Sequence, residues 1–289
     1  MINLTFGEKI WQVVVYSILI ILALLCLLPF LYVIAVSVTP ESEVVRKGIV
    51  IIPESYTFLA YKEVFISHGI GQAYQITLFR TIVGTALNVL FTVLAAYPLS
   101  KKYLPGRSTF LIFIVFTMMF SGGLIPTYLL IRSLGLLNSP WVLIIPTLIS
   151  AFNLVIIKGF FEQLPAEIEE SARVDGASEL QSLWRIILPL SMPVLATISL
   201  FYAVSHWNSY FDAIVYLNDA NLMPLQVVLR NILLNIASES AESMANSGTV
   251  SKFAVQMAAV VVTTVPILIV YPFMQKHFTK GVLMGSIKG

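Results

Sequence analysis

The side chains that usually carry out catalytic chemistry are few and widely separated in this sequence. Its three histidines, His68, His206 and His277, do not have the HExxH spacing of a zinc site. Its single cysteine, Cys26, allows neither an intrachain disulfide nor a cysteine metal cluster. The sequence contains neither a G-x-S-x-G nucleophile elbow nor a glycine-rich phosphate loop ending in Gly-Lys-Ser or Gly-Lys-Thr. We therefore expect that this chain is not an enzyme, holds no metal and does not bind ATP by that route.

A second kind of chemistry is the reversible binding of a polar solute inside apolar surroundings. Aromatic faces stack on the apolar side of a sugar ring, and amides and hydroxyls bind its hydroxyl groups. The densest set of such side chains lies at 206–212, and two asparagines in other apolar segments add to it. The candidates are Asn88, Asn153, His206, Trp207, Asn208 and Tyr210. A second interpretation stays open, in which the aromatic residues belong to a belt at a membrane surface and the polar residues bond between helices.

The most acidic part of the chain lies between 162 and 179. Its six carboxylates are Glu162, Glu167, Glu169, Glu170, Asp175 and Glu179. Pro165 suits the start of a helix, glutamates in the first turn complement the helix dipole, and Gly176 suits a left-handed end. Ser178, followed three residues later by Gln181, has the pattern of a capping box that begins a second helix. The sequence thus predicts two short helices joined at Gly176.

The first of these short helices has a pattern that suits docking. Ile168 and Ala172 share one face at four-residue spacing, the small Ser171 lies beside them, and Glu170 and Arg173 flank the patch. A face of small residues with charged edges can fit a groove of another protein. The alternative interpretation is a pair of solvated helices without a partner.

The elements that carry these residues are apolar helices. Hydrophobic residues make up 58% of the 289 residues and charged residues only 11%, whereas soluble domains are about a quarter charged. An apolar run of about 20 residues crosses a bilayer as a helix. The sequence predicts an all-α integral membrane protein with six transmembrane helices in one domain over 1–289. The expected spans are 11–38, 74–100, 109–131, 139–160, 190–216 and 254–275.

Charges predict the orientation and the kinds of partner. Of the 17 lysines and arginines, ten lie in the segments expected inside, six in those expected outside, and Arg80 within the second span. This bias places both termini in the cytoplasm. For Arg80 we favour a side chain that reaches the headgroups over a role in a pathway, and we place Asp212 near the outer end of the fifth span. With a net charge of +2 and no basic stripe, nucleic acid is not an expected partner.

The acidic segment resembles the cytoplasmic Glu-Ala-Ala loop of ABC-importer permeases, because it keeps every spacing of that motif. The matching residues are Glu170, Ser171, Ala172, Gly176, Ile186, Leu188 and Pro189. Ser171 stands at the second position of the motif, in place of the first alanine, and is nearly as small. The flanking stretches 158–161 and 189–193, and the glycine-rich tail 285–289, resemble the carbohydrate-importer branch that includes the maltose-type permeases.

The resemblance implies a type I importer fold in the bacterial cytoplasmic membrane, with this chain forming half of a pathway. It implies a second and different permease subunit, two ATPase subunits that use ATP and Mg²⁺, and an extracytoplasmic solute-binding protein, while this chain itself binds no cofactor. The loop 162–189 would couple to the ATPase through Glu170, Ser171, Ala172, Asp175, Gly176, Ile186, Leu188 and Pro189. The implied solute is a carbohydrate, with oligosaccharides cut from complex polysaccharides as the expected class.

Two further alternatives remain open at this point. A secondary transporter or channel also fits six spans, although such proteins usually carry a carboxylate at mid-membrane, and none is evident here. The outer loop 217–252, with an amphipathic piece at 225–236, is either a contact for the binding protein or a solvated loop.

Overall fold

The computed structural model describes residues 6–67, 69–239 and 252–285, and every regular element in these ranges is a helix. The prediction of an all-α protein is therefore confirmed for the described residues. Residues 286–289 of the predicted tail and the end of the predicted outer loop lie outside them. The chain divides into two compact units, Met1–Gly69 with Leu229–Val265, and Ile70–Val228 with Pro266–Gly289. The prediction of one permease domain stays a prediction.

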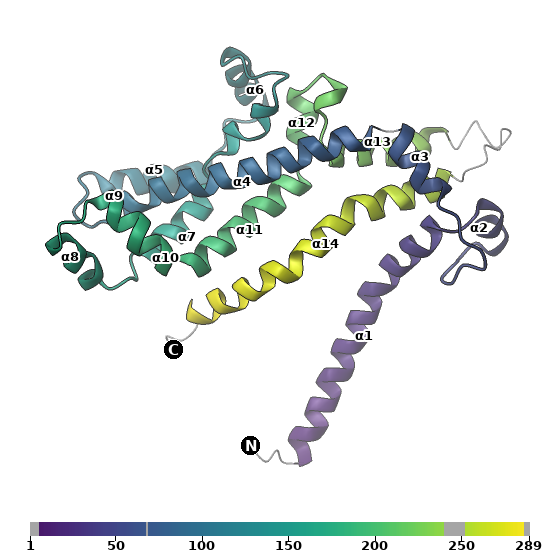
Figure 1. Ribbon diagram of the computed structural model, residues 1–289, viewed down its shortest axis with the longest axis horizontal. Coiled ribbons are helices and arrows are strands. Elements are labelled where there is room, and N and C mark those ends of the chain that lie inside the picture. Colours follow the sequence, from purple (N-terminus) through teal and green to yellow (C-terminus); the bar gives the residue numbers. More distant parts are fainter. Residues whose placement is uncertain (1–5, 68, 240–251, 286–289) are drawn as a thin grey trace. The chain divides into compact units, whose positions relative to one another are not determined.

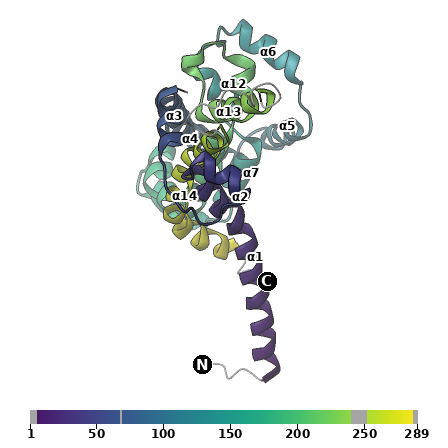
Figure 2. The same ribbon diagram turned by 90° about the vertical axis from the view of Figure 1, so that its right-hand side faces the viewer.

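The first unit begins with the long helix α1, Phe6–Ser37, which continues into α2, Glu41–Lys47, and α3, Leu59–Ser67 (Figures 1 and 2). It also holds part of α13, Leu225–Glu239, and the first half of α14, Lys252–Gly285. Only Ala35, Val36 and Ser37 of α1 are buried, and its leucines and isoleucines are about half exposed. An apolar helix with this much exposed hydrocarbon needs a lipid environment or a partner.

The second unit is built around α4, Ile70–Ser100, which packs against α7, Ala151–Phe161, and α11, Met192–Asn208 (Figure 1). Their contact forms a core that includes Val93, Ala96, Leu154, Ile157, Ile187, Leu195, Ile198 and Tyr202. The remaining elements are α5 Arg107–Met119, α6 Leu124–Ser133, η1 Pro140–Leu143, η2 Ile145–Thr147, α8 Ala166–Val174, α9 Glu179–Ser182, η3 Leu183–Ile187, α10 Leu188–Leu190, α12 Phe211–Tyr216 and η4 Ala220–Leu222.

Among the described residues, three helices are long and apolar enough to cross a membrane, namely α1, α4 and the part of α14 over Lys252–Val270. Three further segments pass the same test only as bent pairs, with bends of 116° between α5 and α6, 50° between η2 and α7, and 84° at Ser191. The expected continuous segment 109–131 is interrupted at 120–123, where Gly123 has a φ of +87°. Glycine takes this conformation without steric cost, so the chain can turn sharply there.

The expected fifth segment, 190–216, is also interrupted. Helix α11 ends at Asn208, Ser209 is extended, and α12 begins at Phe211. The Oδ1 of Asp212 accepts hydrogen bonds from the Ser209 hydroxyl and from the backbone N–H of Ala213, both at 2.9 Å. These bonds stabilise the start of a new helix in place of a continuous one.

Candidate functional site

The second unit contains a polar cavity of about 390 Å³ beside α4, α7 and α11. Its lining is unusual in a chain of this composition, because most of the side chains carry a hydrogen-bonding group. The lining residues are Arg80, Asn88, Pro146, Thr147, Ile149, Ser150, Asn153, Phe201, Tyr202, Ser205, His206, Ser209 and Asp212. A cavity of this size with convergent amides and hydroxyls can hold a small polar solute or a sugar ring.

Three of the six predicted pathway residues line this cavity. They are Asn88 on α4, Asn153 on α7 and His206 on α11, all with less than a tenth of their surface exposed. The side-chain amide of Asn88 donates to the carbonyl oxygen of Thr147 at 3.2 Å. His206 fits closely against Gly84, because a Cβ on that glycine would lie 2.6 Å from Nε2 of the imidazole. The structure thus brings together residues that are more than a hundred positions apart.

The other three predicted pathway residues do not line the cavity. Trp207 is buried and meets Tyr74 edge-on, with ring centroids 6.4 Å apart. Asn208 is exposed, and its amide donates to the carbonyl of Val204 in the preceding turn at 3.0 Å. Tyr210 is 43% exposed. Because α11 ends at Asn208, the helical spacing assumed for 206–212 does not hold beyond it.

The expectation that Arg80 reaches the lipid headgroups is wrong, because its side chain is only 2% exposed. Its Nη2 lies 2.5 Å from Oδ2 of Asp212, and Nη1 lies 3.4 Å from Oδ1. Its two terminal nitrogens also donate to the carbonyls of Ser209, at 3.2 Å, and Leu143, at 3.4 Å. A buried guanidinium is stable when a carboxylate and further acceptors surround it. Arg80 therefore joins α4 to the break between α11 and α12 and to η1.

Sequence reasoning missed the hydroxyl groups of the cavity. The Tyr202 hydroxyl lies 2.8 Å from the Thr92 hydroxyl and accepts a hydrogen bond from the backbone N–H of Ser150 at 3.0 Å. Tyr202, Ser205, His206 and Ser209 follow the helical spacing i, i+3, i+4 and i+7. This polar stripe was the signal that could have found them.

Three buried atoms at the cavity have no hydrogen-bond partner among the described residues, namely Nε of Arg80, Oδ1 of Asn88 and Nε2 of His206. Buried polar atoms are nearly always hydrogen-bonded, to protein or to water. The cavity is thus lined by groups that favour water or a hydroxylated solute.

A second region of interest is the loop 162–189, whose local structure follows the sequence prediction. Helix α8 begins directly after Pro165 and ends at Val174, and Gly176 has a φ of +81°. The capping box is present, because the Gln181 side chain accepts from the Ser178 N–H at 2.8 Å and the Gln181 N–H donates to the Ser178 hydroxyl at 3.3 Å. These short-range contacts need no information from the rest of the chain.

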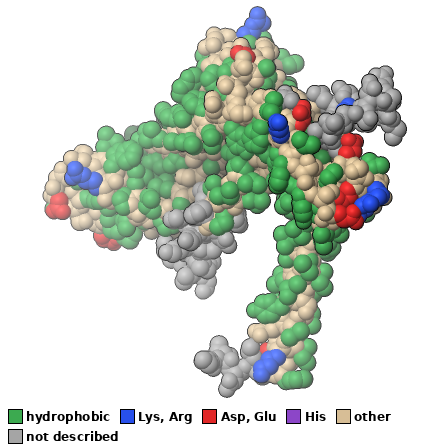
Figure 3. Space-filling model, turned by 45° about the vertical axis from the view of Figure 1, so that its right-hand side comes forward, with side chains coloured by type: hydrophobic (Ala, Val, Ile, Leu, Met, Phe, Trp, Pro, Cys, Tyr) green, Lys and Arg blue, Asp and Glu red, His purple; other side chains and the backbone are tan. Residues whose placement is uncertain are grey.

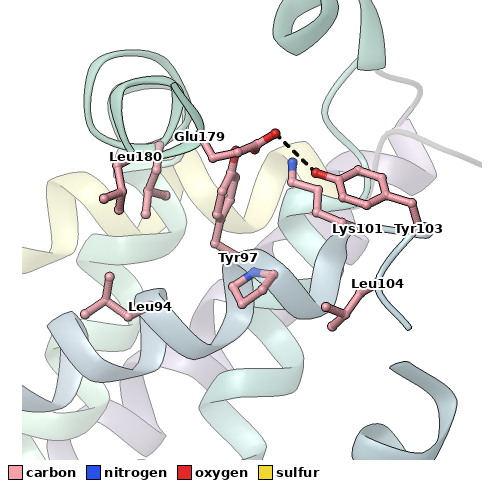
Figure 4. Close-up of a pocket in the computed structure, with 9 residues that line it drawn as sticks. Leu94, Tyr97, Lys101, Tyr103, Leu104, Glu179 and Leu180 are labelled. Carbon is pink, nitrogen blue, oxygen red and sulfur yellow. Dashed lines mark hydrogen bonds between the residues drawn. The ribbon is translucent and has the colours of Figure 1, made fainter. Parts of the chain in front are cut away.

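The six carboxylates of this loop divide into two groups, and the first group, Glu162, Glu169 and Glu179, binds other side chains of the same chain. Glu162 pairs with Arg107 and Lys158, and Glu169 pairs with Lys101. Glu179 accepts from the hydroxyl of Tyr97 at 2.9 Å, from that of Tyr103 at 3.3 Å and from Arg173 at 2.8 Å. Figure 4 shows Tyr97 and Tyr103 turned toward Glu179 beside an apolar pocket of about 290 Å³ that Leu94, Leu104 and Leu180 help to line. The other group, Glu167, Glu170 and Asp175, is exposed.

The exposed face of α8 differs from the predicted one. Ala172 is only 6% exposed and Ile168 is partly buried, so these residues attach the helix to its own chain. The outward positions are Glu167, Glu170, Ser171 and Val174, with Val174 88% exposed. They follow the spacing i, i+3, i+4 and i+7, so they form one helical face. We call these four residues the outer face of α8.

The remaining residues of the predicted coupling set lie where the loop returns to the core. Ile186 and Leu188 are partly buried, and Pro189 is exposed. Between them, Ile187 is fully buried in the core around α4. The residues that follow α9 therefore anchor the loop, and they contribute less to its outer surface than α8 does.

The chain is similar to known proteins over most of its length. A family described as "Binding-protein-dependent transport system inner membrane component" matches residues 69–284. The polygalacturonan/rhamnogalacturonan transport system permease protein YtcP of Bacillus subtilis is 46% identical over 98% of this chain and 99% of its own length. Protein LplC of Bacillus subtilis is 49% identical over 91% of this chain and 90% of its own.

A solved structure shows the same fold. It is the crystal structure of a bacterial ABC transporter involved in the import of the acidic polysaccharide alginate. One of its chains superimposes with a TM-score of 0.87 at 35% identity, over 96% of this chain and 100% of that chain.

Proposed function

We propose that this chain is a permease subunit of an ABC importer and passes a carbohydrate through the membrane. The chain belongs to the family of binding-protein-dependent transport system inner membrane components. Among its relatives are permease proteins named for the transport of polygalacturonan and rhamnogalacturonan, arabinooligosaccharides and galactooligosaccharides. The proposed solute is an oligosaccharide. Because one relative and the alginate importer are named for acidic polysaccharides, oligogalacturonides are the first solutes to test.

The observation that carries the proposal is the polar cavity between α4, α7 and α11. Its amides, hydroxyls and unpartnered buried atoms suit the hydroxyl groups of a sugar, and Phe201 and Tyr202 supply apolar ring surface. One permease supplies one side of such a pathway, so the proposal includes a second, different permease subunit on the other side. An extracytoplasmic binding protein delivers the solute, in keeping with the family description.

The outer face of α8 is the proposed contact with an ATPase subunit. It offers one apolar side chain, Val174, beside the small Ser171 and the two carboxylates Glu167 and Glu170. Glu162, Glu169 and Glu179 hold the loop to its own chain, so a force applied to α8 passes to α4 and to the linker after it. ATP and Mg²⁺ would be used by the partner subunit.

The proposed topology counts each bent helix pair as one crossing. Together with α1, α4 and α14 this gives six crossings of the bacterial cytoplasmic membrane, with both termini in the cytoplasm. The bends carry prolines and glycines whose free backbone groups neighbouring helices can satisfy, which is the condition for irregular backbone at membrane depth.

The experiment that tests the proposal compares two asparagines, one that lines the cavity and one that lies outside it. The importer is reconstituted in vesicles with its ATPases, and uptake of a labelled oligogalacturonide is measured for Asn88→Ala and Asn208→Ala. Asn88 lines the cavity and Asn208 does not, so uptake should fall at least tenfold in the first variant and stay near wild type in the second. Equal uptake by both variants would remove the cavity from the pathway. Uptake without ATPases would favour a secondary transporter or channel instead.

A further inference from the structure

The loop of residues 39–57 leaves and returns at the same place, the last turn of α1. The backbone N–H of Thr57 donates to the carbonyl of Val38 at 2.8 Å, and the Thr39 hydroxyl donates to the carbonyl of Ala35 at 2.7 Å. The hydroxyls of Ser37 and Tyr61 lie 2.8 Å apart and join the same turn to α3. Both ends of the loop are therefore fixed at the end of a helix that is long and apolar enough to cross a membrane.

The charged residues of this loop bind mainly to one another. Glu43 is only 4% exposed and accepts from Lys47 Nζ at 3.0 Å, from the backbone N–H of Glu54 at 2.8 Å and from that of Ser55 at 3.2 Å. Lys47 lies 2.9 Å from Glu54, which also pairs with Arg46. Such a network fixes the loop backbone and leaves few charges that need water.

Four aliphatic side chains of the same loop remain exposed. Val45 is 78% exposed, Ile49 74%, Ile51 58% and Ile52 78%, whereas Val50 between them is buried. We call the four exposed residues the aliphatic tip. In Figure 3 the apolar surface of α1 continues up to this loop, where acidic and basic side chains gather beside apolar ones. Exposed aliphatic groups on a rigid loop cost free energy in water, so they need an apolar environment.

We propose that the aliphatic tip inserts into the lipid of the bilayer surface around the end of α1. The first argument is continuity, because α1 exposes leucine and isoleucine along its length and the loop begins two residues after it. The boundary between headgroups and acyl chains lies within several ångström of the end of a spanning helix, which places the tip at that depth. In the proposed orientation this is the leaflet that faces away from the cytoplasm.

The composition of the tip is the second argument. The residues that dominate the binding energy of protein interfaces are most often Trp, Tyr and Arg. The tip has none of these residues, and branched aliphatic chains suit acyl chains. Tyr56, 67% exposed and next to the base of the loop, has an apolar ring with a polar end, as residues at the membrane surface do. Lipid therefore fits this surface better than a protein partner.

The test uses the reconstituted complex and a fluorescent label that reports its surroundings. Cys26 is the single cysteine, so a Cys26→Ala chain provides a background in which Ile49→Cys or Ile52→Cys carries the only label. Glu41→Cys, an exposed polar position of the same loop, is the matched control. Each labelled complex is exposed to iodide in water and, separately, to phospholipids that carry a doxyl quencher near the headgroup.

We expect the doxyl lipids to quench the labels at 49 and 52 at least threefold more strongly than the label at 41, with iodide showing the opposite order. Strong quenching by iodide at 49 and 52 would overturn the proposal, because the tip would lie in water. Protection from both quenchers would also overturn it, because another subunit would then cover the tip. The result does not depend on whether the complex transports a sugar, so it is independent of the proposed solute.

Discussion

Replacement of Asp212 by asparagine should destabilise the second unit strongly. The change removes the only carboxylate beside Arg80 among the described residues, and the Arg80 side chain is 2% exposed. The guanidinium would then keep only neutral acceptors, the carbonyls of Ser209 and Leu143. Removal of one partner of a buried ion pair costs about 3–5 kcal/mol, and we expect about 3 kcal/mol because the Asp212 side chain is 22% exposed. For a unit of roughly 150–250 residues, the size range of the second unit, that lowers the melting temperature by roughly 6–12 °C.

The assay is thermal unfolding of the purified complex in detergent, followed by the loss of its size-exclusion peak. The Arg80→Met, Asp212→Leu double variant should melt well above Asp212→Asn, because it leaves no unpaired charge buried. Glu170→Gln, which changes an exposed carboxylate, should melt like wild type. If Asp212→Asn also melts like wild type, or if the double variant melts no higher than Asp212→Asn, the two side chains do not form the coupled buried pair described above.

Three further predictions concern other parts of the chain. Gly84→Ala should lower uptake about tenfold with assembly retained, because a Cβ 2.6 Å from Nε2 of His206 displaces the imidazole into the cavity. Uptake at the wild-type level would contradict this prediction. Val174→Asp, at an 88% exposed position, should leave the melting temperature unchanged and reduce co-purified ATPase at least fivefold, and full ATPase recovery would exclude the outer face of α8 as the contact. The pKa of Glu43 is lowered from 4.5 to about 2, mainly by the backbone N–H of Glu54 and also by Lys47. The ionised Glu43 therefore stabilises the loop 39–57, and the loop should lose this stabilisation as the pH falls from 4.5 to 2. Pepsin cleavage of the loop should rise as the pH falls over that range in wild type. The Glu43→Gln variant should show no such rise.

The sequence was sufficient for features that depend on composition or on neighbouring residues. The low fraction of charged residues established that the chain is a helical membrane protein, because an apolar run in lipid must satisfy its own backbone bonds. The capping box at Ser178 and the left-handed Gly176 were predicted correctly, since each depends on a few adjacent residues. The motif around Glu170 also indicated the family, which the match over 69–284 confirms.

Only the tertiary structure decided which way the polar side chains face. Arg80 and Asp212 are 132 positions apart, and the end of α11 at Asn208 turns Asp212 toward Arg80 instead of leaving it on a continuous helix. The same holds for the acidic loop, where Glu169 faces inward and Glu170 outward because the partner of Glu169, Lys101, comes from the end of α4. Helical periodicity gives the relative directions of side chains on one helix. Which face is buried depends on packing and on charged partners distant in the sequence, and these exist only once the chain has folded.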